Sequence, residues 1–143
     1  IGKQYFEDGS SKPLLAGSGA NAQLWMDYIA AHNERDFEAI AAMNTEDFRG
    51  TAAHGEIVEG NAAHAVFLKN WVATENPRWQ VWWVIANDGE NADGDMEEWL
   101  ATGNVVTITG PDGAERRAYE TIDVLLENGK VKMLNVASQT MPE

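Results

Sequence analysis

The chain has 143 residues, a formal net charge of −13 and a hydrophobic content of 44%, so we expect one folded domain with a sizeable core. The acidic balance, with 10 scattered Lys and Arg residues, argues against binding to nucleic acid or to an anionic membrane surface. The lack of cysteine excludes disulfides, thiolate nucleophiles and iron–sulfur clusters.

The N-terminal segment differs in composition from the rest of the chain. Residues 1–20 are rich in Gly, Ser and Lys and lack periodicity, so we expect an extended arm before a single domain over residues 21–143. No apolar run reaches the length of a membrane span, and no signal peptide is visible. We expect a cytoplasmic protein, with a processed exported protein as the alternative because the sequence begins at Ile1.

Three helices are expected in the first half of the domain. One face of the first helix carries Trp25, Tyr28, Ile29 and His32, at positions i, i+3, i+4 and i+7. Asp36 is the expected N-cap of a second, short helix. Asn61 is the expected cap of a third helix, in which Phe67 and Trp71 lie one turn apart.

The remaining segments have the pattern of strands. Residues 47–59 are expected to form two short strands around a turn. Four longer strands follow at residues 79–86, 99–109, 117–126 and 131–138, and an acidic loop at 87–95 joins the first two. Helices followed by a meander of strands indicate an α+β fold with the helices on one face of an antiparallel sheet.

The strand at residues 79–86 is apolar on both faces. Strict alternation puts Trp79, Val81, Trp83 and Ile85 on one face and Trp82, Val84 and Ala86 on the other. A sheet with one solvated face would show polar residues there, so both faces are expected to be covered. A second copy is the simplest cover, and we predict a homodimer through the outer face of the sheet.

Three stretches carry a resemblance to a known family: residues 28–37 (YIAAHNERDF), 57–60 (IVEG) and 122–131 (IDVLLENGKV). With the order of the elements, they resemble the nuclear-transport-factor-2-like superfamily, in its SnoaL-like and ketosteroid-isomerase-like branch. The resemblance covers residues 22–140. It implies a cone-shaped α+β fold, in which three N-terminal helices pack on a strongly curved mixed or antiparallel sheet that encloses an apolar pocket.

The resemblance also implies site residues. Tyr28 and Asp123 match the two oxyanion-hole positions of the ketosteroid isomerases, where a tyrosine and a protonated aspartate donate to a developing enolate oxygen. The stretch at residues 50–53 matches the position of the catalytic carboxylate but contains none, and His54 beside it is the candidate proton acceptor. The expected pocket lining is Trp25, Trp71, Trp83, Trp99, Tyr119 and Thr121.

Alternation along the strand leaves a second interpretation of Asp123 open. It puts Ile122, Val124 and Leu126 on the apolar face, and Tyr119, Thr121 and Asp123 on the opposite one, so that Asp123 would face solvent. The histidines His32, His54 and His64 lack the spacing of a metal site, and the loop at 87–95 does not fit the calcium-loop register. No nucleotide fingerprint is present, so neither a metal nor a cofactor is expected.

Three functions fit these observations. The first is a cofactor-independent enzyme, of the isomerase, cyclase or lyase type, that acts on a small apolar carbonyl compound by acid–base chemistry. The second is a binding protein that uses the same pocket for a hydrophobic ligand without catalysis. The third is a dimeric interaction module whose cavity is filled by aromatic side chains.

Overall fold

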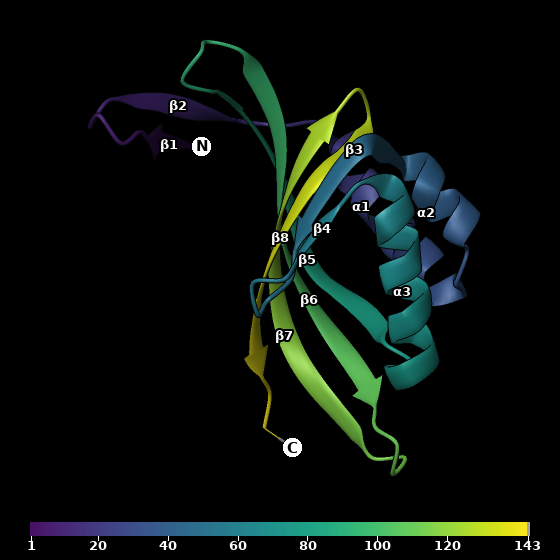
Figure 1. Ribbon diagram of the computed structural model, residues 1–143. Helices are drawn as coiled ribbons and strands as arrows, with labels where there is room; N and C mark the ends of the chain where they lie inside the picture. The colour runs from purple at the N-terminus through teal and green to yellow at the C-terminus, as the bar shows by residue number, and fades with distance from the viewer. Residues whose placement is uncertain (143) are drawn as a thin grey trace.

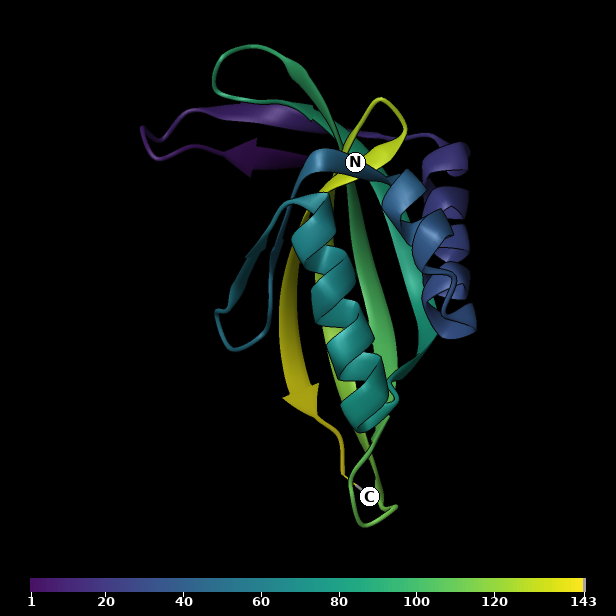
Figure 2. The same ribbon diagram turned by 45° about the vertical axis from the view of Figure 1, so that its right-hand side comes forward.

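The computed structural model describes residues 1–142 and has an α+β architecture, which confirms the expected fold class (Figure 1). Three helices, α1 (Gly19–Glu34), α2 (Phe37–Met43) and α3 (Asn61–Glu75), lie on one side of a curved sheet (Figures 1 and 2). The strands are β1 (Gly2–Tyr5), β2 (Ser11–Ala16), β3 (Asn44–Thr51), β4 (Ile57–Glu59), β5 (Arg78–Glu90), β6 (Met96–Thr109), β7 (Glu115–Glu127) and β8 (Lys130–Thr140). Their order in the sheet is β1-β2-β5-β6-β7-β8-β3-β4, and the sheet is mixed because β3 and β8 run parallel.

The N-caps of α2 and α3 were both predicted from the sequence, and the structure confirms the first and corrects the second. The Asp36 side chain accepts from the backbone N–H of Ala39 at 3.1 Å, as the sequence predicts for the start of α2. Asn61 does not cap α3, because Gly60 with φ 92° holds that position. The Asn61 side chain bonds instead to Ala41 and Asn44, across the packed helices and strands.

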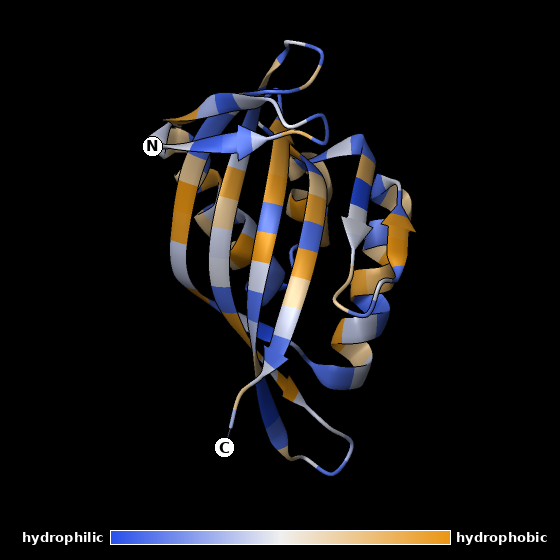
Figure 3. Ribbon diagram, turned by 90° about the vertical axis from the view of Figure 1, so that its left-hand side faces the viewer, coloured by the Kyte–Doolittle hydropathy of each residue, from blue (hydrophilic) through white to orange (hydrophobic). Residues whose placement is uncertain are grey.

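The N-terminal segment contains a β-hairpin. Strands β1 and β2 pair with each other, and β2 pairs with the end of β5 through residues 14–16. The expected acidic loop is shorter than predicted, because residues 87–90 belong to β5 and have backbone partners in β6. The hairpin projects from the end of the sheet on the side away from the helices (Figures 1 and 3).

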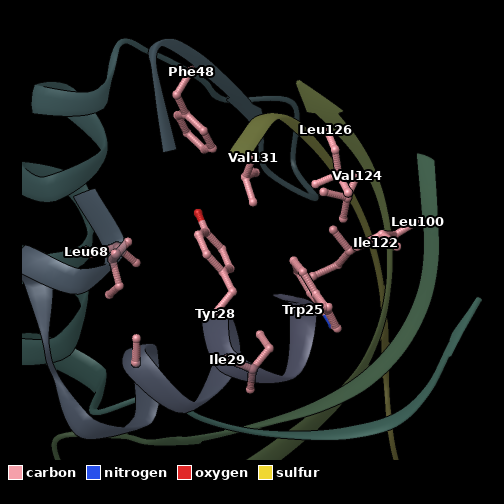
Figure 4. Close-up of a cluster of buried hydrophobic side chains, with 12 residues drawn as sticks. Trp25, Tyr28, Ile29, Phe48, Leu68, Leu100, Ile122, Val124, Leu126 and Val131 are labelled. Carbon is pink, nitrogen blue, oxygen red and sulfur yellow. The ribbon is translucent and has the colours of Figure 1, made fainter. Parts of the chain in front are cut away.

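The core fills the space between the helices and the inner face of the sheet. Its buried members are Trp25, Tyr28, Ile29, Ala31, Ile40, Phe48, Leu68, Leu100, Ile122, Val124, Leu126 and Val131. Tyr28 rises from α1 into the middle of this cluster, with Leu68 on one side and the β7 side chains on the other (Figure 4). The face of α1 predicted from its helical spacing is the buried one.

A β-bulge changes which tryptophans of β5 face the core. The register between β5 and β6 shifts between Val81 and Trp83. The predicted alternation is therefore wrong beyond this point, because a bulge inserts one extra residue and reverses the later side chains. Val81 and Val84 both pack on the core, whereas Trp82 and Trp83 are exposed on the outer side, which Figure 3 shows as a mixture of apolar and polar residues.

Candidate functional site

A cavity of about 560 Å³ lies between α1, α3 and the inner face of the sheet. Its wall is largely apolar and includes Trp25, Ile29, Phe48, Phe67, Leu68, Trp71, Trp79, Ile122, Leu134 and Val136. The exposed lining residues come from the turn between β3 and β4, such as His54, and from the C-terminal half of α3, such as Thr74. The cavity therefore opens to solvent between this turn and α3.

Three buried titratable side chains interrupt the apolar wall. His32 of α1, His64 of α3 and Glu120 of β7 are 7%, 6% and 8% exposed, and all three line the cavity. None of the three was predicted from the sequence to belong to the site. The signal for Glu120 was its place two residues before Ile122, which puts a carboxyl group on the apolar face of its strand.

A chain of hydrogen bonds fixes the tautomer of His64. Nδ2 of Asn61 donates to the carbonyl oxygen of Ala41 at 2.8 Å, and a carbonyl can only accept, so Oδ1 of Asn61 faces Asn44. Nδ2 of Asn44 therefore donates to Asn61 at 3.1 Å and to Nδ1 of His64 at 2.9 Å. Oδ1 of Asn44 accepts from the hydroxyl of Tyr28 at 2.7 Å. His64 accepts at Nδ1 and carries its proton on Nε2.

His32 has the opposite tautomer. Its Nδ1 lies 2.7 Å from the backbone carbonyl oxygen of Tyr28, so Nδ1 carries the proton and donates, and Nε2 keeps its lone pair. The rings of His32 and His64 lie 6.0 Å apart between centroids. Burial lowers the pKa of His32 to about 4, with a smaller contribution from Arg35. Burial and the neighbouring His32 lower the pKa of His64 to about 3, so both rings are neutral at neutral pH.

Neither histidine has a hydrogen-bond partner for its Nε2 among the described residues. Within residues 1–142, Oδ1 of Asp88 is the one side-chain polar atom that is fully enclosed and lacks a hydrogen-bond partner. Any other unpartnered polar atom of a buried residue in this range is therefore at least partly accessible. The Nε2 atoms of His32 and His64 form no hydrogen bond with the described residues and are not fully enclosed, and both rings line the cavity. The wall therefore offers one imidazole donor and one imidazole acceptor.

Glu120 and His32 meet the same indole ring. Nε1 of Trp79 donates to Oε1 of Glu120 at 3.1 Å, and the Trp79 ring meets His32 edge-on, with centroids 5.5 Å apart. Asn33 holds Trp79 in place, because its side chain bonds to both the backbone N–H and the carbonyl of Trp79 at 2.8 Å. Burial raises the pKa of Glu120, and the bond from Trp79 opposes this shift in part.

Tyr28 lines the cavity, but its hydroxyl is already used. The side chain is fully enclosed in the core, and its O–H donates to Asn44. Burial raises the pKa of Tyr28 above its ordinary value, so the hydroxyl stays protonated. The tyrosine thus supports the orientation of Asn44, and through it the tautomer of His64.

Asp123 does not lie in the cavity, which corrects the placement derived from the resemblance. Its side chain is exposed, while Ile122 and Val124 on either side face the core. The interpretation from alternation was the right one. Tyr119 and Thr121 share the outer face with Asp123, because residues two apart along a strand point to the same face of a sheet.

The other predicted site residues divide between the cavity and the outer face. Trp25 and Trp71 line the cavity as expected, whereas Trp83 and Trp99 lie outside it. Nε1 of Trp83 donates to the hydroxyl of Tyr119 at 2.8 Å on the outer face. His54 lies at the opening, exposed, with its Nε2 3.1 Å from a carboxylate oxygen of Glu56.

Two further features concern metals and membranes. Among residues 1–142, no group of three or more His, Asp or Glu side chains is arranged to hold a metal ion. In the same part of the chain, no helix combines the length and the apolar character needed to cross a membrane.

Comparisons with known proteins give structural matches only. No model of a known protein family matches the chain, and no curated protein matches it in sequence. A candidate ketosteroid isomerase from Kribbella flavida superposes with a TM-score of 0.68 at 19% identity, over 90% of this chain and 84% of that one. An epoxide hydrolase/cyclase-like enzyme of pyran ring formation in the polyether salinomycin gives a TM-score of 0.67 at 19% identity, over 83% and 90%. A nuclear-transport-factor-2-like protein from Burkholderia xenovorans gives 0.64 at 14%, over 87% and 93%.

Proposed function

We propose that this chain, which has the nuclear-transport-factor-2-like fold, binds a small and largely apolar carbonyl compound in its cavity and acts on it by cofactor-independent acid–base chemistry of the isomerase or cyclase type. The observation that carries the proposal is the set of three buried titratable side chains, His32, His64 and Glu120, in an otherwise apolar wall. Buried polar atoms cost free energy unless they are hydrogen-bonded, and Nε2 of both histidines has no partner among the described residues, which favours a ligand that pairs with them.

The size of the cavity supports a small-molecule ligand. Its volume of about 560 Å³ lies within the range of about 300–1,000 Å³ that is usual for such sites. Trp25, Trp71 and Trp79 supply rigid apolar surfaces for a carbon skeleton. Because the described lining includes Glu56, Glu75 and Glu120 and no Lys or Arg, a neutral compound is favoured over an anion.

Glu120 is the proposed proton carrier. Burial raises its pKa, which brings proton exchange closer to neutral pH, where a general acid or base is most effective. The low pKa of His64 keeps its ring neutral, and a neutral imidazole N–H can polarise a carbonyl oxygen without giving up its proton. General acid–base help of this kind accelerates a reaction by roughly a hundredfold to ten-thousandfold.

The names of two structural neighbours support an enzymatic use of such a cavity, since one is a candidate ketosteroid isomerase and the other an epoxide hydrolase/cyclase-like enzyme. The alternative is a binding protein without catalysis, because residues 50–53, which match the carboxylate position of the isomerases, contain no carboxylate. An interaction module with a filled cavity is disfavoured by the open volume.

Tryptophan fluorescence tests the binding step. Trp25, Trp71 and Trp79 line the cavity, so a ligand that enters it should change their emission. We expect a saturable change with steroids or aromatic ketones that is weakened in Leu68→Trp, which fills the cavity. A panel that gives no saturable change with the wild-type chain would contradict the proposal.

We also propose that a second copy packs on the outer face of the sheet. Trp82, Trp83 and Ile85 are 51%, 39% and 52% exposed there, although large apolar side chains rarely gather on a solvated strand. The N-terminal hairpin projects on the same side of the sheet and carries Leu15, which is also half-exposed (Figure 1). The hairpin pairs with β5 through only three residues of β2, so a copy seated between this hairpin and the outer face would stabilise both.

A further inference from the structure

The cavity wall offers two neutral imidazole groups of opposite hydrogen-bonding character. The carbonyl oxygen of Ala41 sets the orientation of Asn61 and Asn44, and this leaves the proton of His64 on Nε2. The carbonyl oxygen of Tyr28 takes the Nδ1 proton of His32, and this leaves a lone pair on Nε2. Both assignments depend on backbone carbonyls, which can only accept, so the cavity receives one fixed donor and one fixed acceptor.

We infer that the cavity selects a neutral ligand bearing a hydroxyl group, whose oxygen accepts from Nε2–H of His64 while its O–H donates to Nε2 of His32. The inference rests on the proposed function, because the enol formed from the proposed carbonyl substrate carries such a hydroxyl group. Two hydrogen bonds of about 2.8 Å that meet near the tetrahedral angle at one oxygen join nitrogen atoms about 4.6 Å apart. Ring centroids 6.0 Å apart permit this separation when the two Nε2 atoms turn towards each other. One hydroxyl, or the enol form of a carbonyl compound, can therefore reach both rings.

Other ligand classes leave one or both imidazoles unpaired. A hydrocarbon satisfies neither ring, and a ketone or an ether satisfies His64 but leaves the lone pair of His32 without a donor. A carboxylate meets no cation, because the described lining residues include no Lys or Arg and do include Glu120. Sites built to hydrogen-bond a hydroxyl discriminate against analogues that lack it, because buried polar groups are then left unpaired.

A matched series on one carbon skeleton tests the inference. Tetralin has no polar group, 1-tetralone only accepts, and 1-tetralol both accepts and donates. Isothermal titration of the full chain should show 1-tetralol binding about fivefold or more tighter than 1-tetralone, with tetralin weakest, since each added hydrogen bond contributes roughly 1 kcal/mol. Equal affinity for the three compounds would overturn this inference but leave the proposed small-molecule site intact. Binding of none would overturn both.

A variant assigns the discrimination to the histidine acceptor. His32→Phe keeps an aromatic ring between Tyr28 and Trp79 but removes Nε2. We expect this variant to bind 1-tetralol no tighter than 1-tetralone, while Tyr119→Phe, which removes a hydroxyl on the outer face, keeps the wild-type preference. A preference retained in His32→Phe would overturn the inference.

The tautomers can be measured in the wild-type chain, which keeps the inference testable if His32→Phe fails to fold. Nitrogen-15 NMR of the imidazole rings at pH 7 should show the proton of His32 on Nδ1 and that of His64 on Nε2. The same tautomer in both rings, or a charged ring in either, would overturn the inference.

Discussion

The indole N–H of Trp79 donates a 3.1 Å hydrogen bond to the buried carboxyl group of Glu120, inside the wall of the cavity. The bond holds the carboxyl in a fixed position, while burial raises its pKa. A carboxyl group that is both positioned and protonated more readily than usual is suited to proton transfer in an apolar site. Together with the buried histidines beside it, this carboxyl should make both stability and activity depend on pH.

The histidines should make the folded state sensitive to acid. The folded chain protonates His32 only near pH 4 and His64 only near pH 3, whereas unfolded histidine has a pKa of about 6.5. Between these values the unfolded chain binds more protons, so the free energy of unfolding should fall as the pH drops from about 6.5 towards 4. Urea titrations at a series of pH values measure this. Stability that stays constant across the window would contradict the buried neutral histidines.

Glu120 should act in the opposite direction. Its pKa is raised in the folded state, so the folded chain holds this proton more tightly than the unfolded chain does. The free energy of unfolding should therefore fall as the pH rises through the folded pKa. Glu120→Gln keeps the shape and the acceptor for Trp79 but cannot ionise, so it should stabilise the chain relative to wild type at pH 8 and not at pH 4. Glu127→Gln, at an exposed position of the same strand, is the control and should not show this pattern. A Glu120→Gln effect that is the same at both pH values would contradict the assignment.

Loss of the Tyr28 hydroxyl should destabilise the fold. Tyr28→Phe leaves the buried Oδ1 of Asn44 without its donor, and a buried group left unsatisfied costs about 1–3 kcal/mol. Chemical denaturation of Tyr28→Phe and of Tyr5→Phe, whose ring is exposed on the hairpin, gives the comparison. If the hydroxyl instead serves the ligand, Tyr28→Phe would lose binding without losing stability.

Several features were predictable because local rules decide them. The helical face of α1 and the cap at Asp36 follow from side-chain spacing and from the hydrogen-bonding reach of a short carboxylate, and both are confirmed. The cap at Asn61 was wrong because that side chain serves the packed core instead of its own helix. A local pattern does not reveal a partner that lies 17 or 20 residues away.

The site was less predictable for two physical reasons. A bulge in β5 moved Trp83 to the outer face, and the sequence carries no mark of an extra residue in a strand. Asp123 was assigned to the wrong face through the resemblance, although alternation with Ile122 and Val124 had given the right one. The same alternation puts Glu120 inside, so the strand pattern contained the site carboxyl that the resemblance obscured.

The proposed homodimer should depend on the outer face and on salt. Ile85→Arg puts a charge among Trp82 and Trp83, so it should yield monomers in light scattering after gel filtration. Val66→Arg, at an exposed position of α3, is the matched control. Because each copy carries a net charge of −13, added salt should screen the repulsion and strengthen association. A monomer at all salt concentrations would contradict the proposal.

Deuterium exchange tests the central claim, that the cavity performs acid–base chemistry, most directly. NMR in D₂O follows the replacement of α-hydrogens in a panel of apolar ketones, and it detects enolisation whether or not the ketone goes on to form a product. The account predicts enzyme-dependent exchange that Glu120→Gln lowers at least about a hundredfold and that Asp123→Asn, on the exposed face of the same strand, leaves unchanged. Exchange that survives Glu120→Gln but is lost in Asp123→Asn would contradict it, as would binding of these ketones without any exchange.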